Sequence, residues 1–585
     1  MSNNPPSFVT HLRTKTTEFL TAWLHIWFRP NYPCDNQSGL RIQTTRGLNR
    51  LDIGVRIIVG AGFLAIIVRV IVAPIQTLSH SQTFMAALWA AVIIAAWFLL
   101  RRRIQLADRW LDAHNWQRRT ILWTGHGLLT CVATLWAYAL YQPFRGGWDV
   151  DTVVAAAREW AQTGTFTDPH PFANGNLDYF GSFPNNIGLL NLLRAIGIIT
   201  GPQLFAAAVL VLCVLLSALT IMMCYDIVRR VSSAAQAMAC AVVLWILIGF
   251  SPWICVPYTD TLGLVFPVAI IWLFTKVIAA RSWLRRIALT ATCGIVAGCG
   301  IQVKTTIAIG LIATCLTLFA VAVLSHKNWR SAAACFVILA TVGLGSSHLL
   351  GALLRSALPD GTAQSQPFPL EYFVLTGLSQ SGNGYGSFSA SVTLLMQSVN
   401  TTAQRQELGR EAIIHDLREL GPANYARFLY DKATWIYSDA TFWAFGEGGT
   451  SPAAAFRNSD PMATLLQSLA FPSGSRHMAW MSFVQGLWVA VLSKLLAGLA
   501  QRAKTSFDVL GFCLITSIAG FTLYQLISEA RPRYLFLYAT VIIVSAFVLH
   551  PTAKVASNQE RTVPDLGRTA DTNQPADCRL PVPSQ

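Results

Sequence analysis

The chain has 585 residues, of which 53% are hydrophobic and only 12% are charged, and this composition excludes an ordinary soluble enzyme of its length. Its formal net charge of +15 does not indicate a nucleic-acid partner, because the basic residues form short clusters between apolar stretches, as in the cytoplasmic loops of membrane proteins. We therefore expect a multi-pass protein of the cell membrane, with membrane lipids and no nucleic acid among its partners.

Twelve apolar stretches follow one another along the chain, each near the ~20 residues that a helix needs to cross a bilayer. They cover residues 53–74, 83–100, 119–141, 203–226, 234–250, 261–280, 287–302, 304–324, 331–353, 478–500, 507–527 and 535–549. The predicted fold class is an all-α polytopic membrane protein of about twelve transmembrane helices with two large extracytoplasmic loops.

Clusters of basic residues set the orientation of these helices. They lie at residues 101–103, 281–286, 325–330 and 501–504, on one side of the membrane if the spans alternate. Because cytoplasmic loops carry an excess of lysine and arginine, that side is the cytoplasm. We then expect segment 1–52 to be cytoplasmic, and the tail 550–585, which is rich in proline and polar residues, to be cytoplasmic and disordered.

One apolar stretch, residues 186–199, is short and is interrupted by Arg194. If it crossed the membrane, every later loop would change sides. We predict an interfacial helix on the outer surface, where Arg194 can reach the lipid head groups. A short tilted span is the alternative.

Two stretches between spans are too long to be simple connections, and both fall on the extracytoplasmic side. The first, 142–202, lies within an expected transmembrane catalytic module of residues 53–353. The second, 354–477, precedes the C-terminal transmembrane helices at 478–549. We expect the function to reside in these two outer segments and the helix ends beside them.

The second outer segment is soluble in character. It contains a polar helical pattern at residues 402–420 and an aromatic run at 433–449. Because tryptophan and tyrosine rings are stable at head-group level, we expect the aromatic run to lie at the membrane interface.

The first outer segment opens with two carboxylates, in the sequence WDVDTVVAAAREW. Charge at the mouth of a membrane helix is costly, which favours a function for Asp149. Asp151 could instead be an N-cap, since aspartate is among the strongest capping residues. Further along, the sequence FPNN places Asn185 and Asn186 in a loop whose shape prolines and glycines fix.

Polar residues at two other span ends fall on the same outer side. The sequence PYTDTL brings Tyr258 and Asp260 to the entrance of a span. Lys304 begins another span on the outer side, against the usual distribution of positive charge, which favours a functional or paired role for it.

The sequence ISEARPRYLF, between the last two spans, holds Glu529, Arg531, Arg533 and Tyr534. Arginine presents planar, permanently charged donors that suit phosphate oxygens, so a phosphate-bearing lipid is the expected ligand. The alternative is that Arg531 and Arg533 only bind anionic head groups or pair with Glu529.

These motifs together resemble the GT-C superfamily of integral-membrane glycosyltransferases, in particular the branch of protein O-mannosyltransferases and lipid A aminoarabinose transferases. In that branch the first outer loop opens with an Asp-Glu pair and continues into a surface helix that ends in an AREM-like segment. The sequence DVDTVVAAAREW is similar, with Asp149 at the position of the catalytic aspartate. Val150 replaces the family's glutamate, and Asp151 is the nearest second carboxylate.

The same branch ends this loop in an HPPL-like segment, which FPNN resembles with Asn185 and Asn186 in place of the prolines. The resemblance covers roughly residues 119–353, and it extends more loosely to RPRY. It also favours a non-spanning segment at 186–199.

The resemblance implies an inverting, hexosyl- or mannosyltransferase-like enzyme. Such an enzyme moves a sugar from a polyprenyl-phosphate donor to a cell-envelope glycan, lipid or protein, with its active site outside the cytoplasm. Asp149, and Asp151 as a second carboxylate, are the candidate catalytic residues, the former as the base for the acceptor hydroxyl. The candidate substrate-binding residues are Asn185, Asn186, Tyr258, Asp260, Lys304, Glu529, Arg531, Arg533 and Tyr534.

No metal-ligand spacing is present, and no cofactor is required, although Asp260 could orient the sugar or a divalent ion such as Mg²⁺ or Mn²⁺. The alternative function is a multi-span transporter or flippase of a sugar or a lipid-linked intermediate. Repeat-built transporters carry corresponding broken segments in their two halves, and the sequence has no such repetition. A polymerase or ligase of lipid-linked polysaccharide is a third possibility.

Overall fold

The structure is a computed structural model. It describes residues 41–43, 46–72, 80–141, 144, 146–168, 178–325, 328–381, 384–447, 460–501 and 506–549. The predicted tail at 550–585 and most of the predicted segment 1–52 lie outside the described residues, as do residues 382–383 and 448–449 of the second outer segment.

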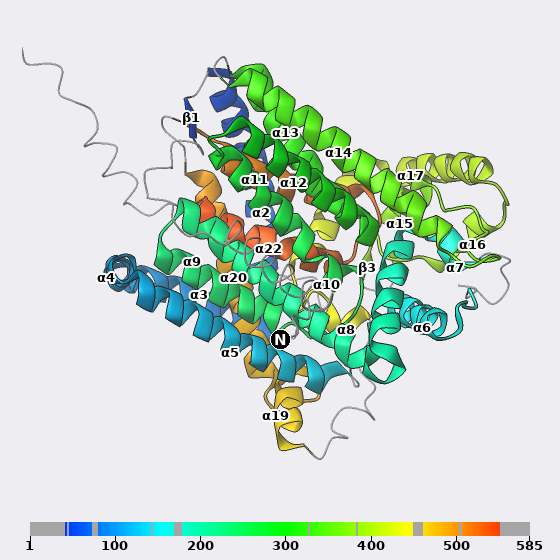
Figure 1. Ribbon diagram of the computed structural model, residues 1–585, viewed down its shortest axis with the longest axis horizontal. Coiled ribbons are helices and arrows are strands. Elements are labelled where there is room, and N and C mark those ends of the chain that lie inside the picture. Colours follow the sequence, from blue (N-terminus) through cyan, green and yellow to red (C-terminus); the bar gives the residue numbers. More distant parts are fainter. Residues whose placement is uncertain are drawn as a thin grey trace, which may run out of the picture. The chain divides into compact units, whose positions relative to one another are not determined.

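The described residues form helices and two short antiparallel ribbons, which confirms the all-α fold class (Figure 1). The helices of the first half are α2 (Arg46–Val72), α3 (His80–Leu99), α4 (Arg101–Ala113), α5 (Asn115–Tyr141), α6 (Trp148–Thr163), α7 (Tyr179–Ser182), α8 (Ile187–Val231), α9 (Ala234–Leu244), α10 (Thr259–Gly263), α11 (Val265–Ala279) and α12 (Trp283–Val303). Those of the second half are α13 (Ala308–Leu324), α14 (Trp329–Ser356), α15 (Leu370–Leu378), α16 (Ala390–Gln397), α17 (Thr402–Tyr437), α18 (Ala444–Glu447), α19 (Pro461–Ala470), α20 (His477–Ala500), α21 (Val509–Ile527) and α22 (Pro532–Val548). The ribbons pair β1 (Arg41–Gln43) with β4 (Ser506–Asp508), and β2 (Gln380–Ser381) with β3 (Gly384–Tyr385).

Every predicted span coincides with a helix. Nine helices of the described residues are long and apolar enough to cross a membrane. They are Gly47–Val72, Gln82–Leu99, Pro184–Val231, Thr259–Ala279, Trp283–Val303, Thr305–Leu324, Trp329–Ser356, His477–Ala500 and Val509–Ile527. The other three predicted spans are α5 and the shorter apolar helices Ala234–Gly249 and Pro532–Val548.

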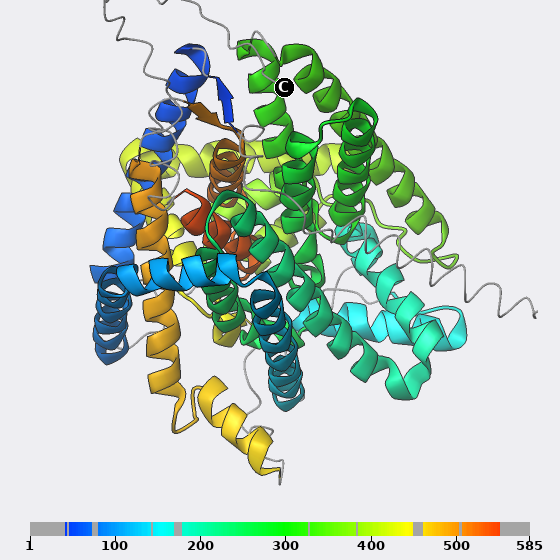
Figure 2. The same ribbon diagram turned by 60° about the vertical axis from the view of Figure 1, so that its left-hand side comes forward.

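The predicted basic loop at 101–103 is the start of a helix, α4, which lies across the bundle between α3 and α5 (Figure 2). Asp108 accepts a hydrogen bond from the Ala235 backbone N–H, and Asp112 pairs with Arg229 at 2.9 Å. These contacts fix α4 to the ends of α8 and α9.

Helix α8 breaks at Gly201, whose φ is 70°, and Pro202 follows directly. Proline cannot continue the hydrogen-bond ladder of the preceding turn, and glycine adopts positive φ without steric cost. The predicted interfacial segment 186–199 is therefore the first arm of α8, distinct in direction from the span after the break. This arm packs on α6, where the Arg194 guanidinium lies 4.0 Å from the Trp160 ring centre.

The second outer segment differs from its prediction. The polar helix expected at 402–420 is present, but α17 continues beyond a break at Gly421–Pro422 to Tyr437. The aromatic run that follows is buried within the protein: Tyr437 packs 5.2 Å from Phe63 of α2, and Phe442 packs 5.7 Å from Trp488 of α20. These rings therefore fill space between helices, and their location at head-group level stays a prediction.

This buried run includes irregular backbone, since Phe442 and Trp443 both have positive φ, at 55° and 59°. Such backbone is stable between membrane helices only when protein groups satisfy its hydrogen bonds. Asp439 accepts from the Trp443 N–H, and Gln485 of α20 accepts from Ala440 N–H. The Trp253 indole donates to the Phe442 carbonyl at 3.0 Å, which fixes Trp253 as well.

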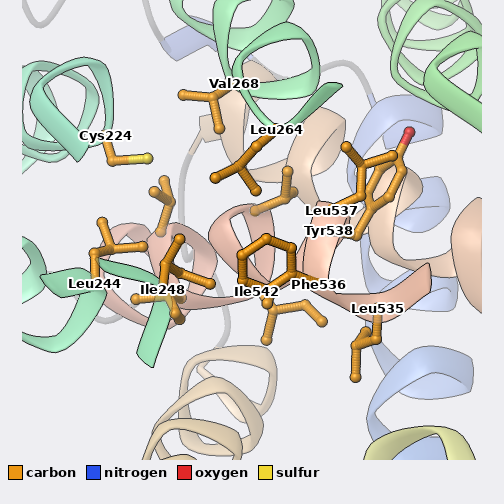
Figure 3. Packing of buried hydrophobic residues seen from close by; sticks show 14 of the residues in the cluster. Cys224, Leu244, Ile248, Leu264, Val268, Leu535, Phe536, Leu537, Tyr538 and Ile542 are labelled. Atoms are coloured by element: carbon orange, nitrogen blue, oxygen red, sulfur yellow. The ribbon is translucent and has the colours of Figure 1, made fainter. Parts of the chain in front are cut away.

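Helix α22 lies at the centre of the core (Figure 3). Its side chains Leu535, Phe536, Leu537, Tyr538 and Ile542 pack with Cys224, Leu244, Ile248, Leu264 and Val268, from α8, α9, the π turn Trp245–Gly249, and α11 with its N-cap. Because α22 is surrounded on all sides, the position of its first residues is fixed.

Helices α12 and α14 approach each other closely through small residues, a common device for packing membrane helices. A Cβ added at Gly298 would lie 2.8 Å from the Ser347 backbone nitrogen and 2.0 Å from Ser346 Oγ. The helices can therefore meet only if residue 298 has no side chain.

We expect Gly298→Ala to lower the free energy of unfolding by about 1–3 kcal/mol, because the added methyl group forces the two helices apart. Gly345→Ala on α14 is the matched control, since nothing lies within 4 Å of a Cβ at that position. Thermal unfolding of both purified variants in detergent measures the effect. Equal stability of the two variants would contradict the described packing of α12 on α14.

Candidate active site

Helix α6 carries the two carboxylates predicted for the site. Gly147 is the N-cap, with a φ of 100°, and Trp148 is the first helical residue. Asp149 and Asp151 both lie in the first turn, where the partial positive charge of the helix N-terminus stabilises them. The alternative that Asp151 caps this helix is wrong, because Gly147 takes that position.

Hydrogen bonds lead from the half-buried Asp149 into the protein. The Tyr179 hydroxyl donates to Asp149 Oδ1 at 3.1 Å, and Asn186 Nδ2 donates to the same hydroxyl at 2.7 Å. The Tyr258 hydroxyl donates to Asn186 Oδ1 at 3.4 Å. Burial raises the pKa of Tyr179 well above its ordinary value, and Tyr258 and Asp149 add to the shift, so this hydroxyl stays protonated. Asp149 is thus oriented by a neutral donor.

A buried ion cluster centres on Asp260, in the first turn of α10. Lys304 Nζ bonds to Asp260 Oδ1, and Arg533 Nε lies 3.3 Å from Asp260 Oδ2. The Asp260 side chain is 1% exposed and that of Arg533 is 3% exposed. Two cations and one carboxylate give the cluster a net charge of +1 in a medium that screens charge poorly.

Aromatic rings join the ion cluster to the Asp149 network. The Arg533 guanidinium carbon lies 5.1 Å from the ring centre of Tyr258, whose hydroxyl belongs to that network. It also lies 5.8 Å from the Trp253 ring centre. The WDVD segment at 148–151 and the RPRY segment at 531–534, far apart in sequence, therefore lie together at one end of the helix bundle.

The rest of the RPRY segment forms a third group beside the ion cluster. Arg531 Nε donates to Glu529 Oε1 at 3.1 Å, and the Tyr534 hydroxyl donates to the same oxygen at 3.1 Å. Lys304 Nζ lies 4.3 Å from the Tyr534 ring centre. Arg531 therefore pairs with Glu529, as the alternative interpretation of this segment held, and it keeps 14% of its side chain exposed.

The structure does not bring every predicted residue into the site. Asp151 is exposed and lies two positions from Asp149, and residues two apart on a helix do not face each other. Asn185 is also exposed, whereas its neighbour Asn186 is buried in the network. Conversely, Trp253 borders the ion cluster but has no local signal in the sequence, because its place depends on the distant loop at Thr441–Phe442.

Two carboxylates bind the first outer segment to the second. Asp168 accepts from the backbone N–H groups of Tyr179 and Ala363, and Asp178 accepts from the Ser365 backbone and hydroxyl. Burial raises the pKa of Asp168, while the backbone donors act in the opposite direction. The start of α7, which carries Tyr179, is therefore held by Asp168 and linked through Asp178 to the second outer segment.

Asp260 does not fit the divalent ion considered from the sequence. Its two oxygens face Lys304 and Arg533, and a metal ion beside them would repel both cations. The group with ligand spacing among the described residues consists of His415, Asp416 and Glu419, all on α17.

Comparison with known proteins gives a family match and several structural neighbours. A family model described as a conserved hypothetical integral membrane protein matches residues 57–554. No curated protein matches the chain at a significant level.

One similar solved structure is the archaeal oligosaccharyltransferase AglB from Archaeoglobus fulgidus in complex with an inhibitory peptide and a dolichol-phosphate. It is 14% identical, with a TM-score of 0.38, over 77% of this chain and 53% of that one, so the chain spans about half the length of AglB. Another is ArnT from Cupriavidus metallidurans bound to undecaprenyl phosphate, 14% identical, with a TM-score of 0.31, over 76% of this chain and 82% of that one.

We expect Arg533→Met to lower the free energy of unfolding by about 3–5 kcal/mol, because it removes one partner of a buried charge cluster. Arg410→Met is the matched control: the Arg410 side chain is 68% exposed and pairs with Glu371, and such surface pairs contribute about 0–1 kcal/mol. Thermal unfolding in detergent compares the two variants. A smaller loss for Arg533→Met than for Arg410→Met would contradict the buried cluster.

Proposed function

We propose that this chain, which belongs to the family of conserved hypothetical integral membrane proteins, is a membrane glycosyltransferase that uses a polyprenyl-phosphate sugar. Its acceptor is a hydroxyl group of a cell-envelope glycan, lipid or protein, on the extracytoplasmic side. One observation carries the proposal: the half-buried Asp149 and the cations Lys304, Arg531 and Arg533 converge at one end of the helix bundle.

Asp149 serves as the general base in this proposal. A carboxylate can accept several hydrogen bonds, so Asp149 can take the acceptor proton while Tyr179 keeps it oriented. As the acceptor oxygen bonds to the anomeric carbon, the bond from that carbon to the phosphate oxygen breaks, and the electron pair leaves with the polyprenyl phosphate. A single displacement of this kind inverts the anomeric centre.

The leaving phosphate gains negative charge, which nearby cations stabilise. Arg531 is the partly accessible cation beside the cluster, since its side chain keeps 14% exposure, whereas Lys304 is buried and paired with Asp260. Arg533 is buried against Asp260. It therefore holds that carboxylate and adds positive charge near the phosphate without contacting it. The apolar lipid tail remains in the bilayer.

We expect Asp149→Asn to reduce sugar transfer by about 10²- to 10⁴-fold, the range that a positioned general base contributes. The assay measures radiolabelled sugar passed from polyprenyl phosphate to acceptors in membranes that contain the protein. Asp151→Asn is the matched control, because Asp151 lies on the same helix turn but faces away, and it should retain transfer. Normal transfer by Asp149→Asn would overturn the base assignment.

Transbilayer movement of the donor by the wild-type protein, without any sugar transfer, would favour the transporter alternative.

Arg531→Gln should raise the KM for the donor by about tenfold or more while leaving the KM for the acceptor little changed, because a charge-assisted bond to phosphate contributes roughly 1.5–3 kcal/mol. Arg355→Gln, at an exposed arginine near the end of α14, is the control for a general loss of positive charge. Steady-state kinetics with each substrate varied separately distinguishes the two effects. An equal rise in both KM values would show that Arg531 is structural.

A further inference from the structure

Lys432 lies on the second arm of α17 and is fully buried. Its ammonium group donates to three backbone carbonyls: Gly377 at 2.7 Å, Leu526 at 3.1 Å and Ser528 at 2.7 Å. A lysine ammonium carries three hydrogens, so each of them has an acceptor. One side chain thus connects α17, the end of α15 and the end of α21.

Two of the three carbonyls that Lys432 binds, those of Leu526 and Ser528, belong to the chain directly before the RPRY segment. Leu526 is in the last turn of α21, and Ser528 is its C-cap. Carbonyls at a helix C-terminus carry partial negative charge, so a cation is stabilised there. Burial lowers the pKa of Lys432 to about 7, while Glu529 acts in the opposite direction, so the three acceptors only partly offset the cost of burying a charged lysine.

The residues after Ser528 are held from the second outer segment. Glu529 N–H donates to the Phe373 carbonyl at 2.7 Å, and Ala530 N–H donates to the Gly386 carbonyl at 2.8 Å. The hydrogen bonds of Lys432 therefore belong to a set of contacts that fixes the backbone of residues 526–530, directly before Arg531.

Glycines allow this close arrangement. Gly386 has a φ of 71°, and a Cβ there would lie 2.6 Å from Lys432 Nζ and 2.6 Å from the Gly377 carbonyl oxygen. A Cβ at Gly377 would lie 2.7 Å from the Ser528 carbonyl oxygen. Side chains at either position would push the segments beyond the reach of Lys432.

We propose that Lys432 is a positioning residue for the donor phosphate: by holding Ser528 and Leu526 it places Glu529 and Arg531 where the phosphate binds. The inference rests on the proposed function and deepens it. Lys432 itself is buried beneath the segment and acts through Arg531.

The test compares Lys432→Met with Tyr430→Phe. Met removes the ammonium group at similar volume. Tyr430 lies on the same arm of α17 as Lys432. Tyr430→Phe removes a hydrogen bond to the Ala65 carbonyl of α2 and leaves the contacts of the segment at 526–531 unchanged. The probe is undecaprenyl phosphate, whose equilibrium binding to each purified full-length variant is measured beside donor and acceptor kinetics.

Lys432→Met should weaken undecaprenyl phosphate binding and raise the donor KM, each on the order of tenfold, with kcat and the acceptor KM changed by less than about twofold, because only the phosphate-binding group is displaced. Tyr430→Phe should bind as the wild type does. Equal binding by Lys432→Met and wild type, or an equal loss in Tyr430→Phe, overturns the positioning role.

If Lys432→Met does not fold, Lys432→Arg is tested in its place, because arginine keeps the charge but presents its hydrogen-bond donors in a different geometry. Weaker binding by a folded Lys432→Arg supports the inference, and unchanged binding overturns it. Wild-type protein that fails to bind undecaprenyl phosphate overturns the proposed function and this inference together, whereas wild-type binding with no effect of either Lys432 variant overturns the inference alone.

Discussion

The arrangement of the site depends on one buried carboxylate, Asp260, held between Lys304 and Arg533. Each partner comes from a different place in the chain: the first turn of α10, the end of α12 and the start of α22. A buried charge without a partner is strongly destabilising, so these three helix ends are constrained to meet. The tight packing around α22 then carries this constraint through the core, because its side chains are enclosed by α8, α9 and α11.

The second outer segment also supports the site. Its buried aromatic run holds Trp253 through backbone carbonyls, and Trp253 in turn borders Arg533. The positive φ angles of Phe442 and Trp443 persist because Asp439 and neighbouring helices satisfy the backbone around them. Such strained backbone is stable only when the surrounding structure determines it, and here it is linked to the ion cluster through Trp253.

The buried and the accessible groups of the site have different roles. Tyr179, Asn186 and Tyr258 are buried and orient other groups, whereas Asp149 and Arg531 remain partly exposed and can meet a substrate. This division, together with the resemblance of the motifs to the GT-C superfamily, is the basis for proposing a base-assisted sugar transfer. The two oxygens of Asp260 face Lys304 and Arg533, so this carboxylate is a poor ligand for a further cation.

Apolar length alone determined the positions of the membrane helices, because a bilayer demands about 20 apolar residues whatever the fold. Charge placed at helix mouths identified Asp149, Asp260 and Lys304, since such charge is costly without a role. The tertiary structure alone decided that Asp149 and not Asp151 enters the network, and that the aromatic run is buried. It also decided that Lys432 holds the segment before Arg531. These outcomes depend on contacts between segments far apart in the chain, 30 residues for Tyr179–Asp149 and 96 for Lys432–Ser528, whose geometry no local pattern encodes.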